Sequence, residues 1–266
     1  MRRLDMHIHT KASDGVLTPK EAVEWAYRIG LTGIAITDHD TVDGIEEAQK
    51  TAMNLEGFEF IPGIEFSTLL SDEEVHILGY HIDYKNKELV ELTRRIKEER
   101  WHRGKKMIEL LNKYNYAITL EEVLQHAGDG VIGRPHIARV LLNKGYVHTL
   151  QNAFEKLLGK GKPAYVERFK LSPQDAILII KKSGGIPVLA HPGLQSRKVN
   201  IMDLIDQGIA GIEVYHTKHT PLENRMYLEV AQRYDLIVTG GSDYHDAYID
   251  GIPAIGSVTV NYLNKK

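Results

Sequence analysis

The chain has 266 residues, no cysteine and a formal net charge of −3 at pH 7. The lack of cysteine excludes disulfides, thiolate nucleophiles and cysteine-ligated zinc, so any bound metal must have nitrogen and oxygen ligands. The slightly acidic balance excludes an overall basic field that would draw the protein onto nucleic acid or a membrane surface. The sequence has no signal-peptide pattern and no apolar run of about 18 residues, and we therefore expect a cytoplasmic protein.

Short β-type runs alternate with helical patterns in the first part of the chain, which predicts βα units and a parallel sheet. The first helix is expected to start at Thr18 and Pro19, an N-cap followed by proline at the first helical position, and to end at Gly30. Asp43 is the expected N-cap of a second helix. Strands are expected at residues 3–9, 33–37, 58–66 and 74–82, and this second helix at residues 43–55.

The pattern changes near residue 86 to helices alone, and we expect them at 86–116, 119–126, 135–143 and 150–158. We interpret residues 99–164 as a helical insertion that caps the mouth of a barrel built from residues 1–98 and 165–266. In the second barrel segment, helices are expected at 172–182, 201–207 and 221–234, strands at 185–190, 211–215 and 236–239, and a last apolar run at 256–260 is a candidate to close the sheet.

Histidines and carboxylates stand at or just after the ends of most predicted strands. A lone histidine in a strand is usually a core residue, and a lone aspartate after a strand is usually a helix cap. Asp38 and Asp40 are either caps or groups that orient His39. In a parallel barrel the carboxyl ends of all strands lie on one face. It is improbable that residues of metal-ligand type stand at five or six of these ends by chance. The candidate ligands are His7, His9, Asp14, His39, Glu65, His76, His191, Asp243 and His245.

The segments DMHIHTKASDG, TDHDT, PGIEFS, AHPG and GSDYH resemble the motifs of the polymerase and histidinol phosphatase (PHP) superfamily. The resemblance implies an α/β fold, a distorted (β/α)7 barrel, with up to three metals on the nine candidate ligands. A first metal would take His7, His9, Glu65 and Asp243. Glu65 would bridge to a second on His76 and His191, and Asp14, His39 and His245 would hold a third. Such ligands suit Mn²⁺, Fe²⁺ or Zn²⁺ without choosing among them.

A cluster of this kind suits the hydrolysis of phosphate esters. Neighbouring metals clamp the phosphoryl oxygens, and a metal-bridging water becomes a hydroxide that attacks in line. We expect His191, Asp243 and His245 to take part in catalysis as well as in metal binding. The general acid for the leaving group is either a histidine or a metal-bound water.

The predicted insertion contains GVIGRPHIARVLL at residues 130–142. Arg134 stands at a helix start beside backbone N–H groups, a natural anion site, and the alternative is that it pairs with a surface carboxylate. Lys162 and Arg197 are further cationic candidates, and His216 is a candidate pocket residue because it ends a strand. The GRPHIARVL stretch resembles the nucleoside 3′,5′-bisphosphate phosphatases, some of which trim short RNA from the 5′ end. That resemblance implies that Arg134 and His136 contact substrate phosphate.

The leading hypothesis is a phosphoesterase that removes the 3′-phosphate of nucleoside 3′,5′-bisphosphates or trims short RNA, with no binding of duplex DNA or membrane. A histidinol phosphate phosphatase would have the same metal ligands, but the GRPHIAR stretch argues against it. A non-catalytic metal-binding module that assists a polymerase is the alternative from another class. A barrel amidohydrolase is disfavoured because no lysine stands at a strand end as a candidate for carboxylation.

Overall fold

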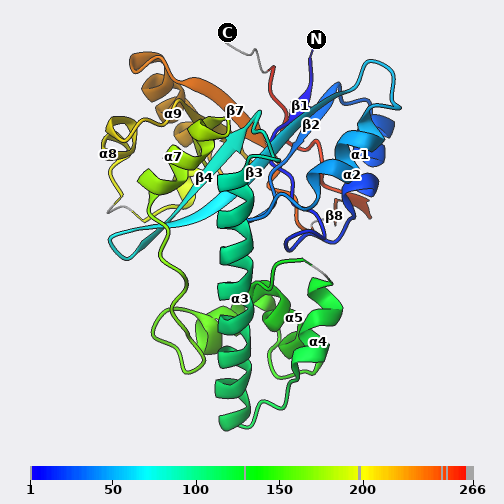
Figure 1. Cartoon of the computed structure of the whole chain (residues 1–266), viewed down its shortest axis with the longest axis vertical. Helices are drawn as coiled ribbons and strands as arrows, with labels where there is room; N and C mark the ends of the chain where they lie inside the picture. Colours follow the sequence, from blue (N-terminus) through cyan, green and yellow to red (C-terminus); the bar gives the residue numbers. More distant parts are fainter. Residues whose placement is uncertain (1, 129, 197–198, 247, 250, 262–266) are drawn as a thin grey trace.

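The computed structural model describes residues 2–128, 130–196, 199–246, 248–249 and 251–261. A seven-stranded sheet curves into a barrel, and long helix α3 (Lys87–Lys113) runs from this barrel into a separate helical part (Figure 1). The strands follow one another in the sheet in chain order. They are β1 (Leu4–Asp5), β2 (Gly33–Ile36), β3 (Glu59–Leu70), β4 (Glu73–Tyr80), β5 (Ile186–Leu189), β6 (Gly211–His216) and β7 (Ile237–Gly241), with a small hairpin of β8 (Tyr248–Ile249) and β9 (Ile252–Pro253).

The helices begin largely where the sequence places their caps. Thr18 and Glu21 form a capping box at the start of α1, and Thr220 and Glu223 do so at α9. Asp43 is not the cap that the sequence predicted, because Gly44 precedes α2 and Asp43 forms an ion pair with Lys97. The barrel helices are α1 (Pro19–Arg28), α2 (Ile45–Ala52), α7 (Pro173–Lys182), α8 (Ile201–Asp206) and α9 (Pro221–Arg233). The remaining helices are α4 (Leu120–Ala127), α5 (Arg134–Asn143), α6 (Leu150–Ala153) with the π-helical turn η1 (Phe154–Leu158), and the 3-10 turn η2 (Pro192–Leu194).

The expectation of a wholly parallel sheet is wrong for β4, which runs antiparallel to both β3 and β5. The connection between β3 and β4 consists of Ser71 and Asp72, which is far too short for a parallel crossover. His76 pairs with Ser67 in the register of this hairpin. The first half of β4 therefore lies beside the carboxyl end of β3, and His76 faces the same rim as the other strand ends.

The barrel closes between β1 and β7, where the Met6 N–H donates to the Gly240 carbonyl at 3.2 Å. A side chain at Gly241 would bring its Cβ within 2.3 Å of the His7 backbone nitrogen, so this close approach requires glycine. The apolar run at 256–260 forms no strand. It contributes an isolated antiparallel bridge between Val260 and Leu4.

The apolar core is divided between the barrel and the helical part. The first half of α3 buries Leu89 and Ile96 in the barrel cluster, and its second half buries Met107 and Leu111 in a cluster formed with α4, α5, α6 and η1. A single helix thus belongs to both cores, and Figure 1 shows α3 running from the barrel into the helical part. The limits of the insertion at residues 99 and 164 stay a prediction. None of the described helices is both long and apolar enough to cross a membrane.

Candidate metal centre

His7 and His9 lie in the extended segment that follows β1, and both side chains are fully buried. The segment is held on two sides, by the Thr37 N–H that donates to the Ile8 carbonyl and by the bridge between Ile8 and Tyr244. Alternate residues of extended backbone share a face, and the two Nε2 atoms come within 3.1 Å of each other.

Glu65 on β3 is the centre of the cluster and has no solvent exposure. Its Oε2 lies 2.9 Å from His39 Nδ1, 3.3 Å from His9 Nε2 and 3.5 Å from His7 Nε2. Its Oε1 lies 2.9 Å from His191 Nε2 and 3.0 Å from His76 Nδ1. Imidazoles from the ends of β1, β2 and β5, and from the first half of β4, therefore surround one buried carboxylate.

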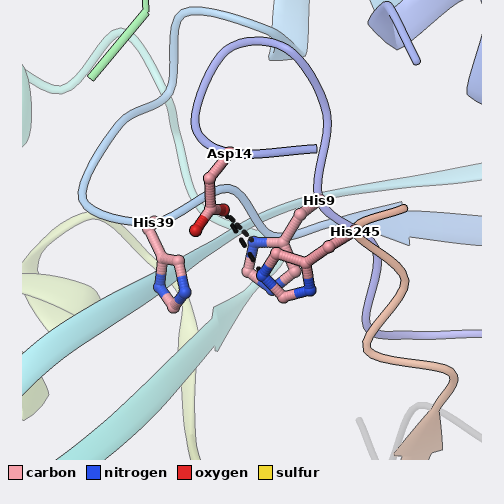
Figure 2. Close-up of side chains that lie close together, drawn as sticks. All are labelled: His9, Asp14, His39 and His245. Carbon is pink, nitrogen blue, oxygen red and sulfur yellow. Dashed lines mark ion pairs between the residues drawn. The ribbon is translucent and has the colours of Figure 1, made fainter. Parts of the chain in front are cut away.

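A second group surrounds Asp14, in the loop after β1. Figure 2 shows its carboxylate directed at His9 and His245, with His39 on its other side. Asp14 Oδ1 lies 3.3 Å from His245 Nε2 and 3.9 Å from His9 Nδ1, and the rings of His9 and His245 stack at 4.0 Å. Asp243 completes the cluster, because its Oδ1 lies 3.2 Å from His9 Nε2 and 3.4 Å from His7 Nε2.

Several of the ligand atoms are buried and make no contact with hydrogen-bond geometry, although His39 Nδ1 and Glu65 Oε2 lie 2.9 Å apart. These atoms are His9 Nδ1, His39 Nδ1, Glu65 Oε2, His76 Nε2 and His191 Nδ1. A buried polar atom with no partner is costly, and divalent cations would satisfy several of them at once. The ligand atoms form four sets, and within each set all atoms lie within 4.8 Å of one another. Four residues belong to two sets each, namely His7, His9, His39 and Glu65. The donor set therefore fits a multinuclear metal centre. The sets are His9, Asp14, His39, His245; His7, Glu65, His191; His7, His9, Asp243; and His39, Glu65, His76.

The carboxylates of the cluster stay ionised. Burial alone would raise the pKa of Glu65, but His39, His76 and His7 hold that pKa well below its usual value. Burial is outweighed at Asp14 and Asp243 too, where His245 and His7 are among the neighbours that depress the carboxyl pKa values. The site therefore presents three ionised carboxylates as ligands for cations.

Two further residues orient the cluster, and the sequence singled out only one of them. Glu213 on β6 is fully buried, accepts the His7 Nδ1 proton at 3.0 Å and accepts the His191 backbone N–H at 2.8 Å. His216 accepts the Lys218 N–H at its Nδ1, so its Nε2 carries the proton, 3.2 Å from Asp243 Oδ2. An acid inside the apolar strand GIEVY was the available signal for Glu213.

The aspartates around His39 have structural partners. Asp38 accepts the Thr10 N–H at 2.7 Å and the Ser13 hydroxyl at 2.6 Å, and thereby holds the loop that carries Asp14. Asp40 forms a buried ion pair with Arg100 of α3. Neither aspartate caps a described helix, and none of these contacts reaches the His39 ring, so the orienting of His39 stays a prediction.

A pocket of ≈ 230 Å³ opens beside the cluster. We call it the arginine pocket, because Arg100, Arg103, Arg134 and Arg168 line it together with Glu74, and it reaches Asp14, His39 and His76. Sequence reasoning named Arg134 alone, since the other three lie in charged or irregular segments that resemble solvated surface. Arg134 is near a carboxylate as well as the pocket, with Glu74 at 3.4 Å.

Two other predicted substrate-binding residues, His136 and Lys162, do not line the arginine pocket. The side chain of His136 is 4% exposed and accepts the Gly133 N–H at Nδ1 behind the arginine pocket. Lys162 is exposed in the turn after η1, and within the described part of the chain it lines neither the arginine pocket nor the other spaces beside the cluster. Arg197 lies outside the described residues.

The chain matches the model of the PHP domain over residues 5–167. The chain belongs to the PHP family. The 5′-3′ exoribonuclease Rnm of Salmonella typhimurium is 34% identical over 250 residues, which cover 91% of this chain and 84% of that relative. A 3′,5′-nucleoside bisphosphate phosphatase of Chromobacterium violaceum is 33% identical over 251 residues, with 92% and 88% covered. A solved structure from Bifidobacterium adolescentis, described as a metal-dependent phosphoesterase, superposes with a TM-score of 0.87 at 33% identity and covers 96% of this chain and 91% of that one.

The PHP family and the geometry together confirm the predicted fold class and the predicted hydrolase class. The protein is a metal-dependent phosphoesterase with a barrel-shaped seven-stranded sheet and buried histidine and carboxylate clusters at its rim. The individual ligand assignments and the substrate stay predictions.

Proposed function

We propose that this PHP phosphoesterase removes the 3′-phosphate of nucleoside 3′,5′-bisphosphates and releases nucleoside 5′-phosphates from the 5′ end of short RNA. The nine predicted ligands would hold two to three Mn²⁺, Fe²⁺ or Zn²⁺ ions. One observation carries the substrate: the arginine pocket adjoins the candidate metal centre and shares Asp14, His39 and His76 with it. A substrate that puts one phosphate in the arginine pocket and another at the candidate metal centre must be a small molecule with two phosphates.

The arginine pocket has the charge that a second phosphate needs. Its four guanidinium groups are largely buried, and burial together with the neighbouring Arg134 and Arg100 lowers the pKa of Arg103. In the free protein, Glu74 partly balances this charge, with its Oε1 2.7 Å from Arg168 Nη1. A bound phosphate would replace the carboxylate and accept paired hydrogen bonds from the arginines, which suit phosphate geometry.

Bound metals would supply charge neutralisation and an activated water at the scissile phosphate. The chain's own residues position the reactants. His7 and His216 direct their protons at Glu213 and Asp243, which leaves His7 Nε2 and Asp243 Oδ1 turned toward the shared centre. The arginine pocket holds the 5′-phosphate, so the 3′-phosphate is presented to the centre and the 3′-oxygen is the leaving group.

The test compares adenosine 3′,5′-bisphosphate with adenosine 3′-phosphate on Mn²⁺-loaded protein. The wild type is expected to prefer the bisphosphate, and Arg134→Met to lower kcat/KM for the bisphosphate about tenfold to hundredfold while sparing the monophosphate, since one charge-assisted contact is lost. Arg94→Met, an exposed change on α3, is the matched control. Equal turnover of both substrates by the wild type would refute the proposed function, and faster turnover of histidinol phosphate would favour that alternative.

A further inference from the structure

A second and larger space opens on the other side of the candidate metal centre. We call it the outer groove; its volume is ≈ 890 Å³, and it runs between the helical part and the loop that follows β7. In Figure 1, α5 and the β8 hairpin lie on the same side of α3. The residues that line the outer groove, but not the arginine pocket, include Arg139, Leu150, Thr217, Lys218 and Asp246.

The outer groove and the arginine pocket form one continuous path. Both are lined by Asp14 and His39 from the candidate metal centre, and both are lined by Pro135 and Phe154 from the helical part. The Arg134 guanidinium lies over the Phe154 ring, 5.6 Å from its centroid, on the side of the arginine pocket. A ligand that fills the arginine pocket and reaches the metals can therefore continue directly into the outer groove.

The two ends of this path differ in size and charge. The arginine pocket, at ≈ 230 Å³, lies below the usual range for sites that hold an organic ligand, whereas the outer groove, at ≈ 890 Å³, lies within that range. In the outer groove, Arg139 is paired with Asp246, and no described carboxylate forms an ion pair with the exposed Lys218. Pro135, Leu150 and Phe154 add apolar lining to the same groove. Aromatic and apolar surface beside a cation is the combination that binds single-stranded nucleic acid.

We propose that the outer groove binds the second nucleotide of a 5′-phosphorylated RNA strand. This inference rests on the proposed function. The first nucleotide has its 5′-phosphate in the arginine pocket, and the phosphate that joins it to the second lies at the metal centre. Water attacks that phosphorus, the bond to the 3′-oxygen of the first nucleotide breaks, and this oxygen takes up a proton. The phosphoryl group stays on the second nucleotide as a new 5′-phosphate.

This arrangement explains how one centre serves two substrates. In a nucleoside 3′,5′-bisphosphate the scissile phosphate carries no further nucleotide, so the outer groove is not used. In RNA the shortened strand has a new 5′-phosphate that fits the arginine pocket, and trimming proceeds from the 5′ end. Lys218 and Leu150 then determine how well RNA is used, because they line the outer groove and not the arginine pocket.

The experiment measures kcat/KM for adenosine 3′,5′-bisphosphate and for the 5′-phosphorylated dinucleotide pApA on the same Mn²⁺-loaded preparations. Lys218→Ala is expected to lower the ratio of dinucleotide to bisphosphate turnover about tenfold, the effect of one lost contact to a charged group. Leu150→Trp fills the groove and is expected to lower the ratio further. Lys20→Ala, an exposed lysine on α1, is the matched control and keeps the ratio.

The outcomes separate the two proposals. Variants that both keep the wild-type ratio would overturn the outer groove and leave the proposed function intact. A wild type that cleaves the bisphosphate but not pApA would overturn the outer groove and the RNA-trimming part of the proposed function, while removal of the 3′-phosphate stands. A wild type that cleaves neither substrate would overturn both. Lys218→Ala removes a charge and Leu150→Trp adds bulk, so if one of these variants fails to fold, the other still tests the outer groove.

Discussion

At the scale of single residues, the chemistry depends on which nitrogen of each imidazole is left to bind a cation. Glu213 accepts the His7 Nδ1 proton, so the lone pair of His7 is at Nε2, where Glu65 and Asp243 converge. A backbone carbonyl orients His245 in the same way. The Asp243 carbonyl lies 3.0 Å from His245 Nδ1, so Nε2 is the ring nitrogen that faces Asp14. The imidazoles of His7 and His245 are thus aligned by the Glu213 carboxylate and the Asp243 backbone carbonyl.

Glu213→Gln tests this alignment. The amide has the same shape but lacks the charge that orients and polarises His7, and loss of such a partner typically weakens metal binding about 10- to 100-fold. We expect that loss of Mn²⁺ affinity in a calorimetric titration, with a circular dichroism spectrum like that of the wild type. Glu229→Gln on the exposed face of α9 serves as the control. Unchanged affinity in Glu213→Gln would show that His7 needs no such partner.

Residues of this kind mark the limit of prediction from sequence. His7, His9 and Glu65 could be predicted because strand ends of a barrel share one rim, and motif spacing then supports each position. Glu213 and Arg100 could not, because a sequence does not say toward which neighbour a buried acid or a helical arginine turns. Both acquire their roles only through partners far away in the chain, at His7 and Asp40.

At the scale of elements, the start of α5 combines helix capping with the arginine pocket. Gly133 has no side chain to cap α5, and its N–H donates instead to His136 Nδ1 at 3.1 Å. Burial lowers the pKa of His136 to about 4, since a buried imidazolium would lose both water and this accepted bond. The neutral ring therefore holds the turn that presents Arg134.

This predicts a pH-dependent stability. His136 has a pKa of about 4 when folded and an ordinary value of 6.5 when unfolded, so between these values the unfolded chain binds more protons. The free energy of unfolding should fall as pH drops from 6.5 toward 4, by at most about 3 kcal/mol. Urea denaturation at pH ~7 and ~4.5 measures the loss. His136→Gln keeps an acceptor for the Gly133 N–H without titrating, and should show a smaller loss; equal losses would contradict the assignment.

The sheet shows that local sequence patterns do not determine the direction of a strand. Sequence periodicity predicted a strand near β4, and the expected parallel direction was wrong because the alternation of side chains along a strand does not depend on its direction. The two-residue connection through Ser71 and Asp72 was the missing clue, since only a hairpin is that short. The reversal leaves His76 at the rim, so the predicted cluster survives an incorrect strand direction.

At the scale of the whole molecule, the barrel supplies the candidate metal centre and the helical part supplies the surfaces around it. Helix α3 joins the two, because its Arg100 pairs with Asp40 next to His39 while its second half lies in the other core. The Val131 N–H also donates to the Ala12 carbonyl at 3.2 Å, near Asp14. In the proposed function, the reaction takes place at the barrel rim, and substrate choice depends on Arg134 and Leu150 of the helical part together with Lys218 of the barrel.

The proposed hydrolysis of phosphoesters requires several metal ions bound at the barrel rim. The direct measurement is a titration of chelator-treated protein with Mn²⁺ in which bound ions and phosphate release from adenosine 3′,5′-bisphosphate are followed on the same samples. We predict about two to three ions per chain, no release from the metal-free protein, and release that rises as the ions bind. Full phosphate release from metal-free protein, or full activity with a single bound ion, would contradict the account.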